Sequence, residues 1–294
     1  MGARDLLSDA TTVSHSARDA EPIELSGRDF NRIRRIIFEL AGIDLNASKQ
    51  NMVYSRLARR LRSHAMTSFG PYLDRLESDP QFAQAERQEF VNALTTNLTS
   101  FFREQHHFPV LADLLGRGLA GRPARIWCAA ASTGEEAYSI AMTVVEALGP
   151  ASNARVLATD IDTQVLASAR CGVYPEQAIQ SCGLHRARRF FLRGTGANAG
   201  MVRVRPDLAR LVEFGQLNLL EPAWPLLNRL GTPLDAVFCR NVMIYFNRAT
   251  QRAVLERIAA VLRPGGLLFA GHSENFTDCR EWFALRGKTV YERL

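Results

Sequence analysis

A short run of small and acidic residues has the composition of a ligand-binding turn. The segment Ser132–Gly134 is followed directly by Glu135 and Glu136, and Asp160 stands at the end of a later apolar run. Small residues let a backbone approach a ligand closely, and carboxylates accept hydrogen bonds and attract cations. These residues are therefore the first candidates for a binding site.

The elements around this turn predict how it is positioned. Residues 125–131 form an apolar run of strand length, residues 135–148 carry apolar side chains at helical spacing, and residues 156–158 form a second apolar run. A parallel strand–helix–strand unit places its turn and the acid after its second strand at one edge of the sheet, beside a helix N-terminus. The sequence thus predicts a doubly wound α/β sheet with an adenosine-bearing cofactor at that edge.

The acids at the turn indicate which cofactor fits. A dinucleotide would place its pyrophosphate where Glu135 and Glu136 repel it, and the turn has a single glycine, which also disfavours a nicotinamide dehydrogenase. S-adenosylmethionine carries a cationic sulfonium, an ammonium group and a ribose, all of which suit carboxylates. One alternative stays open, in which Glu135 and Glu136 only complement the helix dipole and Asp160 only caps the next helix.

Length and composition are those of an ordinary globular protein. The 294 residues suggest about two domains, and 47% hydrophobic with 22% charged residues is typical of a chain that buries a core. No apolar run has membrane-spanning length and Met1–Pro22 lacks a signal peptide's apolar core, which predicts a cytoplasmic protein. The five cysteines are irregularly spaced, so neither disulfides nor a metal site is expected.

The chain before the sheet is predicted to be helical. Residues 1–22 are polar and are expected to form a mobile tail, and residues 23–95 are expected to form a small helical domain. Its helices are predicted at about 26–42, 48–64, 69–78 and 83–95.

Arginines concentrate on the second of these helices. Apolar residues recur every four positions on one face, and the arginines of the other face are Arg56, Arg59, Arg60 and Arg62. No Asp or Glu lies between Asp44 and Asp74, and the whole chain has a net charge of +6. A solvated basic face is one interpretation, but the long gap without acids favours a surface that meets an acidic partner.

Polar residues connect the helical domain to the sheet domain. The linker, residues 96–107, contains Asn97, Thr99 and Arg103, whose side chains could close over the cofactor because the linker enters just before the first strand. The sheet domain is predicted to comprise residues 108–294.

Two further features belong to the sheet domain. The segment 172–210 is too long for a simple connection between a helix and the next strand. It contains extended arms around Gly194–Gly200, which predicts an inserted small antiparallel β subdomain. Residues 283–291 are predicted to form a terminal antiparallel hairpin turning at Gly287 and Lys288.

Several long motifs occur in the order used by one known family. They are Asn92–Arg103 (NALTTNLTSFFR), Ala129–Glu136 (AAASTGEE), Cys239–Phe246 (CRNVMIYF) and Gly271–Asn275 (GHSEN). Over about residues 25–294 the chain resembles the chemotaxis receptor glutamate methyltransferases, the CheR family of class I S-adenosylmethionine-dependent methyltransferases. The resemblance implies a Rossmann-like methyltransferase sheet and methyl transfer to glutamate side chains on the cytoplasmic helices of chemoreceptors.

The same resemblance assigns roles to residues. It implies that Arg240 and Tyr245 lie near the reacting carboxylate as catalytic residues. The residues that it places around S-adenosyl-L-methionine are Asn97, Thr99, Arg103, Glu136, Asp160, Asn218, Leu219, Cys239, Arg240 and Asn241. Of these, the expected partners are the ribose for Asp160, the methionine ammonium for Glu136, the methionine carboxylate for Arg103 and the adenine for Asn218.

The resemblance also implies partners. The chemoreceptor cytoplasmic domain is the expected substrate of a monomeric enzyme, with the arginine-rich helix facing it. The inserted subdomain corresponds to the part that holds a receptor C-terminal pentapeptide in some family members, and whether it does so here stays open. Two other functions also stay open, a nucleic-acid methyltransferase that uses the basic surfaces to follow phosphates and a non-catalytic receptor adaptor that binds S-adenosylmethionine. No nucleic-acid partner is expected, because the chain lacks an aromatic-rich loop for stacking flipped bases.

Overall fold

Four helices build the N-terminal part of the chain. The computed structural model describes residues 23–117 and 122–294, and the predicted mobile tail lies outside these residues. The helices are α1 (Gly27–Ala41), α2 (Gln50–Ser63), α3 (Phe69–Ser78) and α4 (Pro80–Leu94). They confirm the four predicted helices. The last begins three residues earlier than predicted, because Asp79 caps it through the N–H groups of Gln81 and Phe82 and Pro80 fits its first turn.

A buried carboxylate joins three of the elements in this helical part. The apolar face of α2 packs into the core of the helical part. Glu86 of α4 accepts two hydrogen bonds from Arg60 of α2, at 2.8 and 2.5 Å. His64 and the hydroxyl of Tyr72 contact the same carboxylate, which is 2% exposed. Burial works to raise the pKa of Glu86, but these partners outweigh burial and hold its pKa below the ordinary value.

A seven-stranded sheet forms the second part of the chain, with the strand order β6-β2-β1-β7-β8-β10-β9. The first five of these neighbours run parallel, and β10 is antiparallel to both β8 and β9. The strands are β1 (Arg125–Cys128), β2 (Arg155–Asp160), β6 (Val212–Gln216), β7 (Leu234–Phe238), β8 (Leu262–Phe269), β9 (Phe283–Gly287) and β10 (Val290–Arg293). The predicted doubly wound sheet and terminal hairpin are therefore confirmed.

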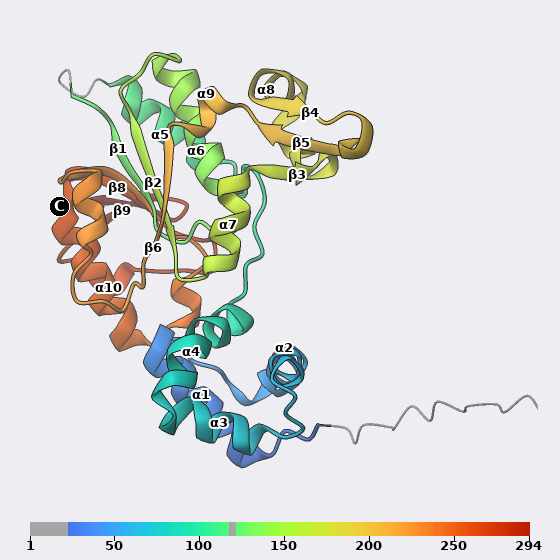
Figure 1. The fold of residues 1–294 in the computed structure, drawn as a ribbon. Helices are drawn as coiled ribbons and strands as arrows, with labels where there is room; N and C mark the ends of the chain where they lie inside the picture. The colour runs from blue at the N-terminus through green and yellow to red at the C-terminus, as the bar shows by residue number, and fades with distance from the viewer. Residues whose placement is uncertain (1–22, 118–121) are drawn as a thin grey trace, which may run out of the picture.

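Helices cover both faces of this sheet, as the ribbon shows (Figure 1). They are α5 (His107–Gly116), α6 (Glu135–Leu148), α7 (Thr163–Cys171) and α10 (Arg248–Val261). The strands between them are apolar on both sides: Ile126 packs toward one core and its neighbour Trp127 toward the other. Among the described helices, none combines the length and the apolar composition needed to cross a bilayer.

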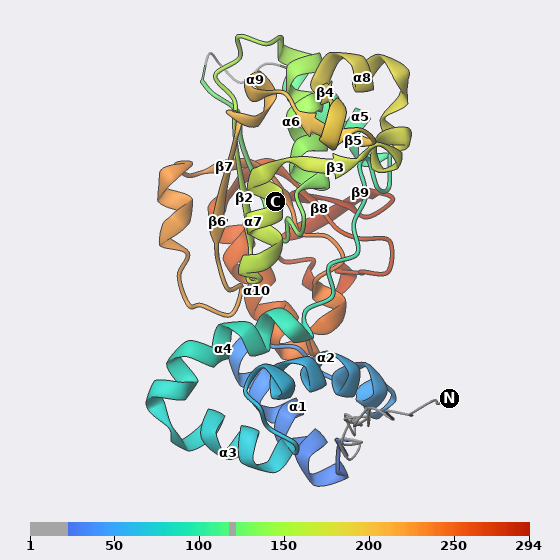
Figure 2. The same cartoon turned by 45° about the vertical axis from the view of Figure 1, so that its right-hand side comes forward.

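The insert between α7 and β6 projects from the sheet domain beside α6 (Figure 2). Its strands form a separate antiparallel sheet of order β3-β5-β4, which confirms the predicted β subdomain and hairpin. Its elements are β3 (Val173–Pro175), α8 (Gly183–Phe190), β4 (Phe191–Arg193), β5 (Met201–Val204) and α9 (Pro206–Ala209). The sequence did not indicate α8, because its eight residues include too few apolar side chains to reveal a helical period. Arg186 of this helix pairs with Glu146 of α6.

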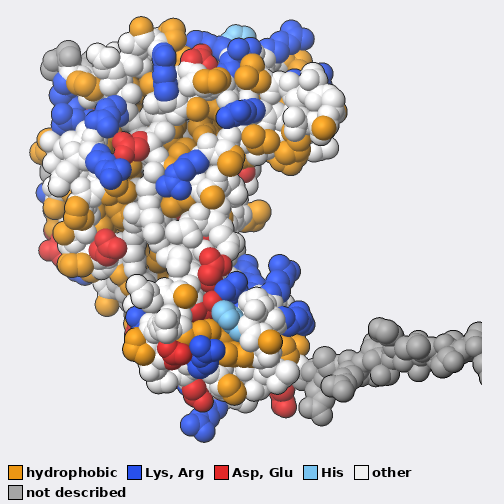
Figure 3. Space-filling view, in the orientation of Figure 1, with side chains coloured by type: hydrophobic (Ala, Val, Ile, Leu, Met, Phe, Trp, Pro, Cys, Tyr) orange, Lys and Arg blue, Asp and Glu red, His pale blue; other side chains and the backbone are white. Residues whose placement is uncertain are grey.

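The surface is concave between the insert and the helical part, and Lys and Arg side chains lie on both sides of this hollow (Figure 3). The hollow opens toward the edge of the sheet at which the chain passes from α4 into α5. The fold thus brings three separately built parts around one edge of the sheet.

The network at Glu86 generates a stability prediction. Replacing Glu86 with Gln should lower the free energy of unfolding by about 3 kcal/mol at neutral pH, because Arg60 then lacks its buried counter-charge. Since the pKa of Glu86 lies below its ordinary value in the folded state, this contribution should be lost only as the pH falls below about 4.3. Urea unfolding at pH 7 and at low pH measures both effects.

The matched control is Glu89→Gln in the same helix. Glu89 lies 3.6 Å from Arg60 and is one-third exposed, so its loss should cost less than about 1 kcal/mol. Equal costs for the two variants would show that the buried network does not stabilise the helical part.

Candidate functional site

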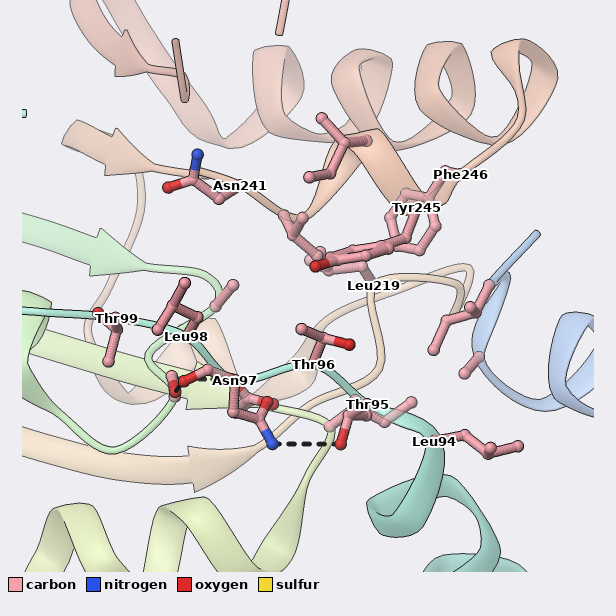
Figure 4. Close-up of a pocket in the computed structure, with 18 of the residues that line it drawn as sticks. Leu94, Thr95, Thr96, Asn97, Leu98, Thr99, Leu219, Asn241, Tyr245 and Phe246 are labelled. Atoms are coloured by element: carbon pink, nitrogen blue, oxygen red, sulfur yellow. Dashed lines mark hydrogen bonds between the residues drawn. The ribbon is translucent and has the colours of Figure 1, made fainter. Parts of the chain in front are cut away.

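A cavity of about 470 Å³ lies where the helical part meets the carboxyl ends of the parallel strands. Its walls come from the end of α1, from α2, from the segment after α4, and from the residues that follow β1, β2, β6 and β7. Figure 4 shows Leu94–Thr99 on one side of this space and Asn241, Tyr245 and Phe246 on the other. A volume of this size is typical of sites that bind a small organic ligand.

The cavity gathers most of the residues predicted from the sequence. Those that line it are Asn97, Thr99, Arg103, Glu136, Asp160, Asn218, Leu219, Arg240, Asn241 and Tyr245. Cys239 is the exception, because its side chain is fully buried on the side of the sheet where Val237 and Leu268 pack. Burial raises the pKa of this thiol well above its ordinary value, so Cys239 is a core residue beside the site.

Asp160 holds the turn that follows β1. One of its oxygens accepts the backbone N–H of Ser132 at 2.8 Å, and the other accepts the N–H of Asp162 at 3.0 Å. Burial raises the pKa of Asp160 to about 6, although these backbone hydrogen bonds favour the ionised form. The cap of α7 is instead supplied by Asp162, which excludes the interpretation of Asp160 as a simple helix cap.

The single glycine of the turn is needed for packing. Gly134 has φ +99°, and a Cβ at this position would lie 2.9 Å from Ala169 of α7 and from the hydroxyl of Tyr174. That hydroxyl donates a hydrogen bond to the carbonyl of Thr133, at 2.7 Å. Ser132 lines the cavity, so the expectation of a small residue beside the ligand applies to it. Gly134 instead allows the close packing of α7 and of Tyr174 from the insert.

The linker is fastened to the sheet at Asp162. Asn97 and Thr95 both donate to one oxygen of this carboxylate, at 2.8 and 2.6 Å, and Asn97 also donates to Thr95 (Figure 4). The hydroxyl of Ser132 donates to the carbonyl of Asn97 at 2.8 Å. This network fixes the position of the linker at the edge of the sheet, and the closing of its side chains over the cofactor stays a prediction.

Arg240 is the most deeply buried charge in the cavity wall. Its side chain is 0% exposed, donates to Glu136 at 2.5 Å and to the carbonyl of Arg103 at 2.6 Å, and lies 3.4 Å from Glu104. Its Nε has no hydrogen-bond partner among the described residues. The sequence predicted the residue, but Glu104 was missed, and its only signal was its place within the FFRE segment.

The loop that carries Arg240 and Tyr245 is held by a second acid. Glu274 accepts the backbone N–H groups of Asn241, Val242, Met243 and Gly271 at distances between 2.5 and 3.0 Å. Burial raises the pKa of Glu274 despite these hydrogen bonds. The motif GHSEN was noticed in the sequence, but no role was predicted for this glutamate.

The helical part is attached directly to the same loops. The amide of Asn218 donates to the carbonyl of Leu40 at 2.8 Å, and the N–H of Asp44 donates to the carbonyl of Tyr245 at 2.8 Å. The side-chain amide expected at the adenine is therefore already used to join the two parts. Leu219 is buried beside it and contributes an apolar surface to the cavity.

The four arginines of α2 divide into two pairs. Arg56 lines the cavity and donates to the carbonyls of Leu94 and Thr95, and Arg60 belongs to the Glu86 network. Arg59 and Arg62 are exposed, and neither forms an ion pair with another described residue. The predicted basic surface is thus reduced to Arg59 and Arg62.

One cluster could be mistaken for a metal site. Glu104, His106 and His107 bring possible ligand atoms within 4.8 Å of one another. The guanidinium of Arg240 lies 3.4 Å from Glu104 and already supplies a positive charge there. Burial and the charge of Arg240 lower the pKa of His107 to about 3, so its ring is neutral.

The chain matches one protein family over nearly all of the described residues. Residues 28–95 match "CheR methyltransferase, all-alpha domain" and residues 97–292 match "CheR methyltransferase, SAM binding domain". Among curated relatives it is similar to "Chemotaxis protein methyltransferase 2" of Pseudomonas aeruginosa, with 54% identity covering 90% of this chain and 92% of the relative.

Two other relatives carry similar names. "Chemotaxis protein methyltransferase" of Escherichia coli is 51% identical, covering 92% of each chain. "Chemotaxis protein methyltransferase 1" of Vibrio cholerae is 35% identical, covering 90% of this chain and 94% of the relative.

The environment of Asp160 gives a prediction for the site itself. Its carboxyl should titrate near pH 6 in the folded protein without ligand, because burial disfavours its charge. Carbon NMR of the aspartate carboxyls across pH 3–8 should detect this titration, and Asp160→Asn should remove it. A titration near the ordinary aspartate value of about 3.9 would contradict the description of the turn.

Proposed function

The chain belongs to the CheR methyltransferase family, and from this premise we propose that it methylates glutamate side chains on chemoreceptor cytoplasmic helices. The enzyme is an S-adenosylmethionine-dependent methyltransferase that acts in chemotaxis. The products are glutamate methyl esters and S-adenosylhomocysteine. We place this activity in the cytoplasm and in a monomer.

One observation supports the cofactor more than any other. The cavity wall at the carboxyl ends of the strands contains two carboxylates, Glu136 and Asp160, and a buried guanidinium whose Nε has no partner among the described residues. A cofactor with a cationic amino-acid end, a carboxylate and a ribose complements such a set, whereas a pyrophosphate would meet the two acids unfavourably. We assign Glu136 to the ammonium, Asp160 to the ribose and Arg103 to the methionine carboxylate.

The chemistry requires little proton transfer. S-adenosylmethionine supplies an electrophilic methyl group on a positively charged sulfur. A glutamate side chain has an ordinary pKa of about 4.3 and is already ionised at neutral pH, so no general base is needed. The protein therefore has to exclude water and hold one carboxylate oxygen in line with the bond that breaks.

Arg240 and Tyr245 are the residues that we assign to this positioning. Both line the cavity, both lie on the loop held by Glu274, and the guanidinium and the hydroxyl are groups that bind a carboxylate. Methyl transfer neutralises the carboxylate, so a strong ion pair in the ground state would slow the reaction. The pairing of Arg240 with two other acids limits its attraction for the substrate.

The rim of the cavity offers an apolar and a basic surface to the substrate helix. Leu98 is 80% exposed and Ile244 is 47% exposed, although both side chains belong to residues that line the cavity. Along α2, Arg59 lies one turn beyond Arg56, on the row of residues that borders the cavity. An amphipathic receptor helix with acidic residues beside its apolar face is complementary to this combination.

The insert gives a second surface for the receptor. Among the residues that the structure describes, no further strand pairs with the outer edges of the sheet β3-β5-β4, and Leu192 on β4 is 40% exposed. An extended C-terminal receptor peptide could add as a strand to such an edge. We extend the proposal to this tail as a tether that raises the local concentration of the substrate.

The direct test mixes the protein with radiolabelled S-adenosylmethionine and receptor cytoplasmic fragments. Label that enters the receptor and is released by mild base identifies glutamate methyl esters. Transfer to RNA in place of receptor would establish a nucleic-acid methyltransferase, and cofactor binding without transfer would establish an adaptor.

Charge reversal on α2 generates a prediction about the receptor surface. The double variant Arg59→Glu and Arg62→Glu should raise the KM for receptor about tenfold at low salt, because the reversed charges repel an acidic partner. Cofactor affinity should stay unchanged, because neither side chain lines the cavity. Steady-state methylation at several salt concentrations measures the effect. The control reverses two exposed arginines elsewhere, Arg248 and Arg252, and should leave KM unaltered.

Tyr245 gives a prediction about turnover. Tyr245→Phe should lower the single-turnover methylation rate about tenfold with saturating cofactor and receptor, because the carboxylate loses one group that orients it. Cofactor affinity and melting temperature should stay close to wild type. A normal rate would remove Tyr245 from catalysis, and a matching loss of stability would indicate that it supports the loop.

A further inference from the structure

Arg240 lies between two carboxylates that differ in their access to the cavity. Glu136 lines the cavity, whereas Glu104 lies behind Arg240 and is not among the lining residues. The three side chains form a buried group with one positive and two negative charges. A ligand that enters the cavity can therefore reach Glu136 without reaching Glu104.

Glu104 is held in place on one side and unsatisfied on the other. Its Oε1 accepts the backbone N–H of His272 at 3.1 Å and faces the ring nitrogen of the same residue at 3.2 Å. Its Oε2 is buried, has no hydrogen-bond partner among the described residues, and points toward the Nη2 of Arg240 at 3.4 Å. A buried carboxylate oxygen with an unused acceptor position is costly unless a donor arrives.

The backbone conformation around Glu104 is strained. Glu104 has φ +56° and Phe102 has φ +52°, both in the left-handed region that residues other than glycine rarely occupy. The N–H of Phe102 is fixed by the hydroxyl of Ser139, at 2.9 Å. Two residues of one short turn thus have unfavourable backbone conformations, and this turn directs the Glu104 side chain toward Arg240.

Glu104 remains ionised in this position. Burial works to raise its pKa, but the charge of Arg240 and the hydrogen bonds from His272 outweigh burial, and the pKa stays below its ordinary value. A negative charge is therefore available behind Arg240 at every pH near neutrality.

We propose that Glu104 is a positioning residue. It becomes the close ion-pair partner of Arg240 when the ammonium group of the cofactor binds Glu136. This inference rests on the proposed function. The 2.5 Å contact with Arg240 engages Oε2 of Glu136, one oxygen of the carboxylate that we assign to the ammonium. Glu104 offers the guanidinium a second acceptor 3.4 Å away, so the exchange moves no charge out of the buried group.

The exchange also defines what Arg240 can do afterwards. Paired with Glu104, its charge stays balanced and does not repel the cationic end of the cofactor. The N–H group released from Glu136 remains at the cavity wall, where a substrate carboxylate can accept it. Glu104 thereby couples cofactor binding to the release of the Arg240 N–H group that binds the substrate carboxylate.

The test compares three ligands on the Glu104→Gln variant by calorimetry. S-adenosylmethionine has the ammonium and the sulfonium, S-adenosylhomocysteine has the ammonium alone, and 5′-methylthioadenosine has neither. The affinity for the first two should fall about tenfold, because the ligand-bound state loses the counter-charge of Arg240 while the free state keeps Glu136. The affinity for 5′-methylthioadenosine should stay within about twofold of wild type.

Other patterns overturn the proposal. Equal losses for all three ligands, with a lower melting temperature, would show that Glu104 only supports the fold, and a loss confined to S-adenosylmethionine would show that it acts on the sulfonium. The exposed variant Glu281→Gln, which removes one surface charge, should leave all three affinities unchanged. If the wild-type protein binds none of the ligands, the proposed function itself fails, and this result is distinct from any effect of Glu104.

Discussion

The buried guanidinium of Arg240 joins the segments from which the site is built. It comes from the end of β7, contacts Glu136 at the start of α6, and lies beside Glu104 in the linker. Burying a charge is unfavourable unless close partners compensate it, so the three segments have to keep their relative positions. The geometry of the cavity therefore depends on an electrostatic constraint as well as on the packing of the sheet.

The helical part completes the cavity and does more than offer a surface to a partner. Arg56 holds the segment after α4, Asn218 is bonded to Leu40 at the end of α1, and Tyr245 is bonded to Asp44 shortly after this helix. Movement of the helical part would therefore open the site. Cofactor binding and receptor contact are consequently expected to influence each other, because the same helix α2 borders the cavity and carries Arg59 and Arg62.

Local patterns in the sequence were sufficient for most of the fold. Hydrophobic periodicity predicted the four helices and the strand–helix–strand unit, since each depends on residues close together in the chain. The helix α8 was missed because its eight residues include few apolar side chains. The pattern also placed Arg60 on a free basic face, because its acid, Glu86, lies on another helix, far away in sequence. Family motifs supplied the cavity residues, but they did not distinguish Cys239, which faces the core, from Arg240 beside it.

The most direct test of this account is a crystal structure with S-adenosylhomocysteine bound. The quantity to measure is the distance from Arg240 to each of its two acids. The account predicts that the 2.5 Å contact with Glu136 is lost, and that the 3.4 Å separation from Glu104 shortens to a hydrogen bond of about 2.8 Å. A ligand-bound structure in which Arg240 keeps its contact with Glu136, and Glu104 stays 3.4 Å from Arg240, would contradict it.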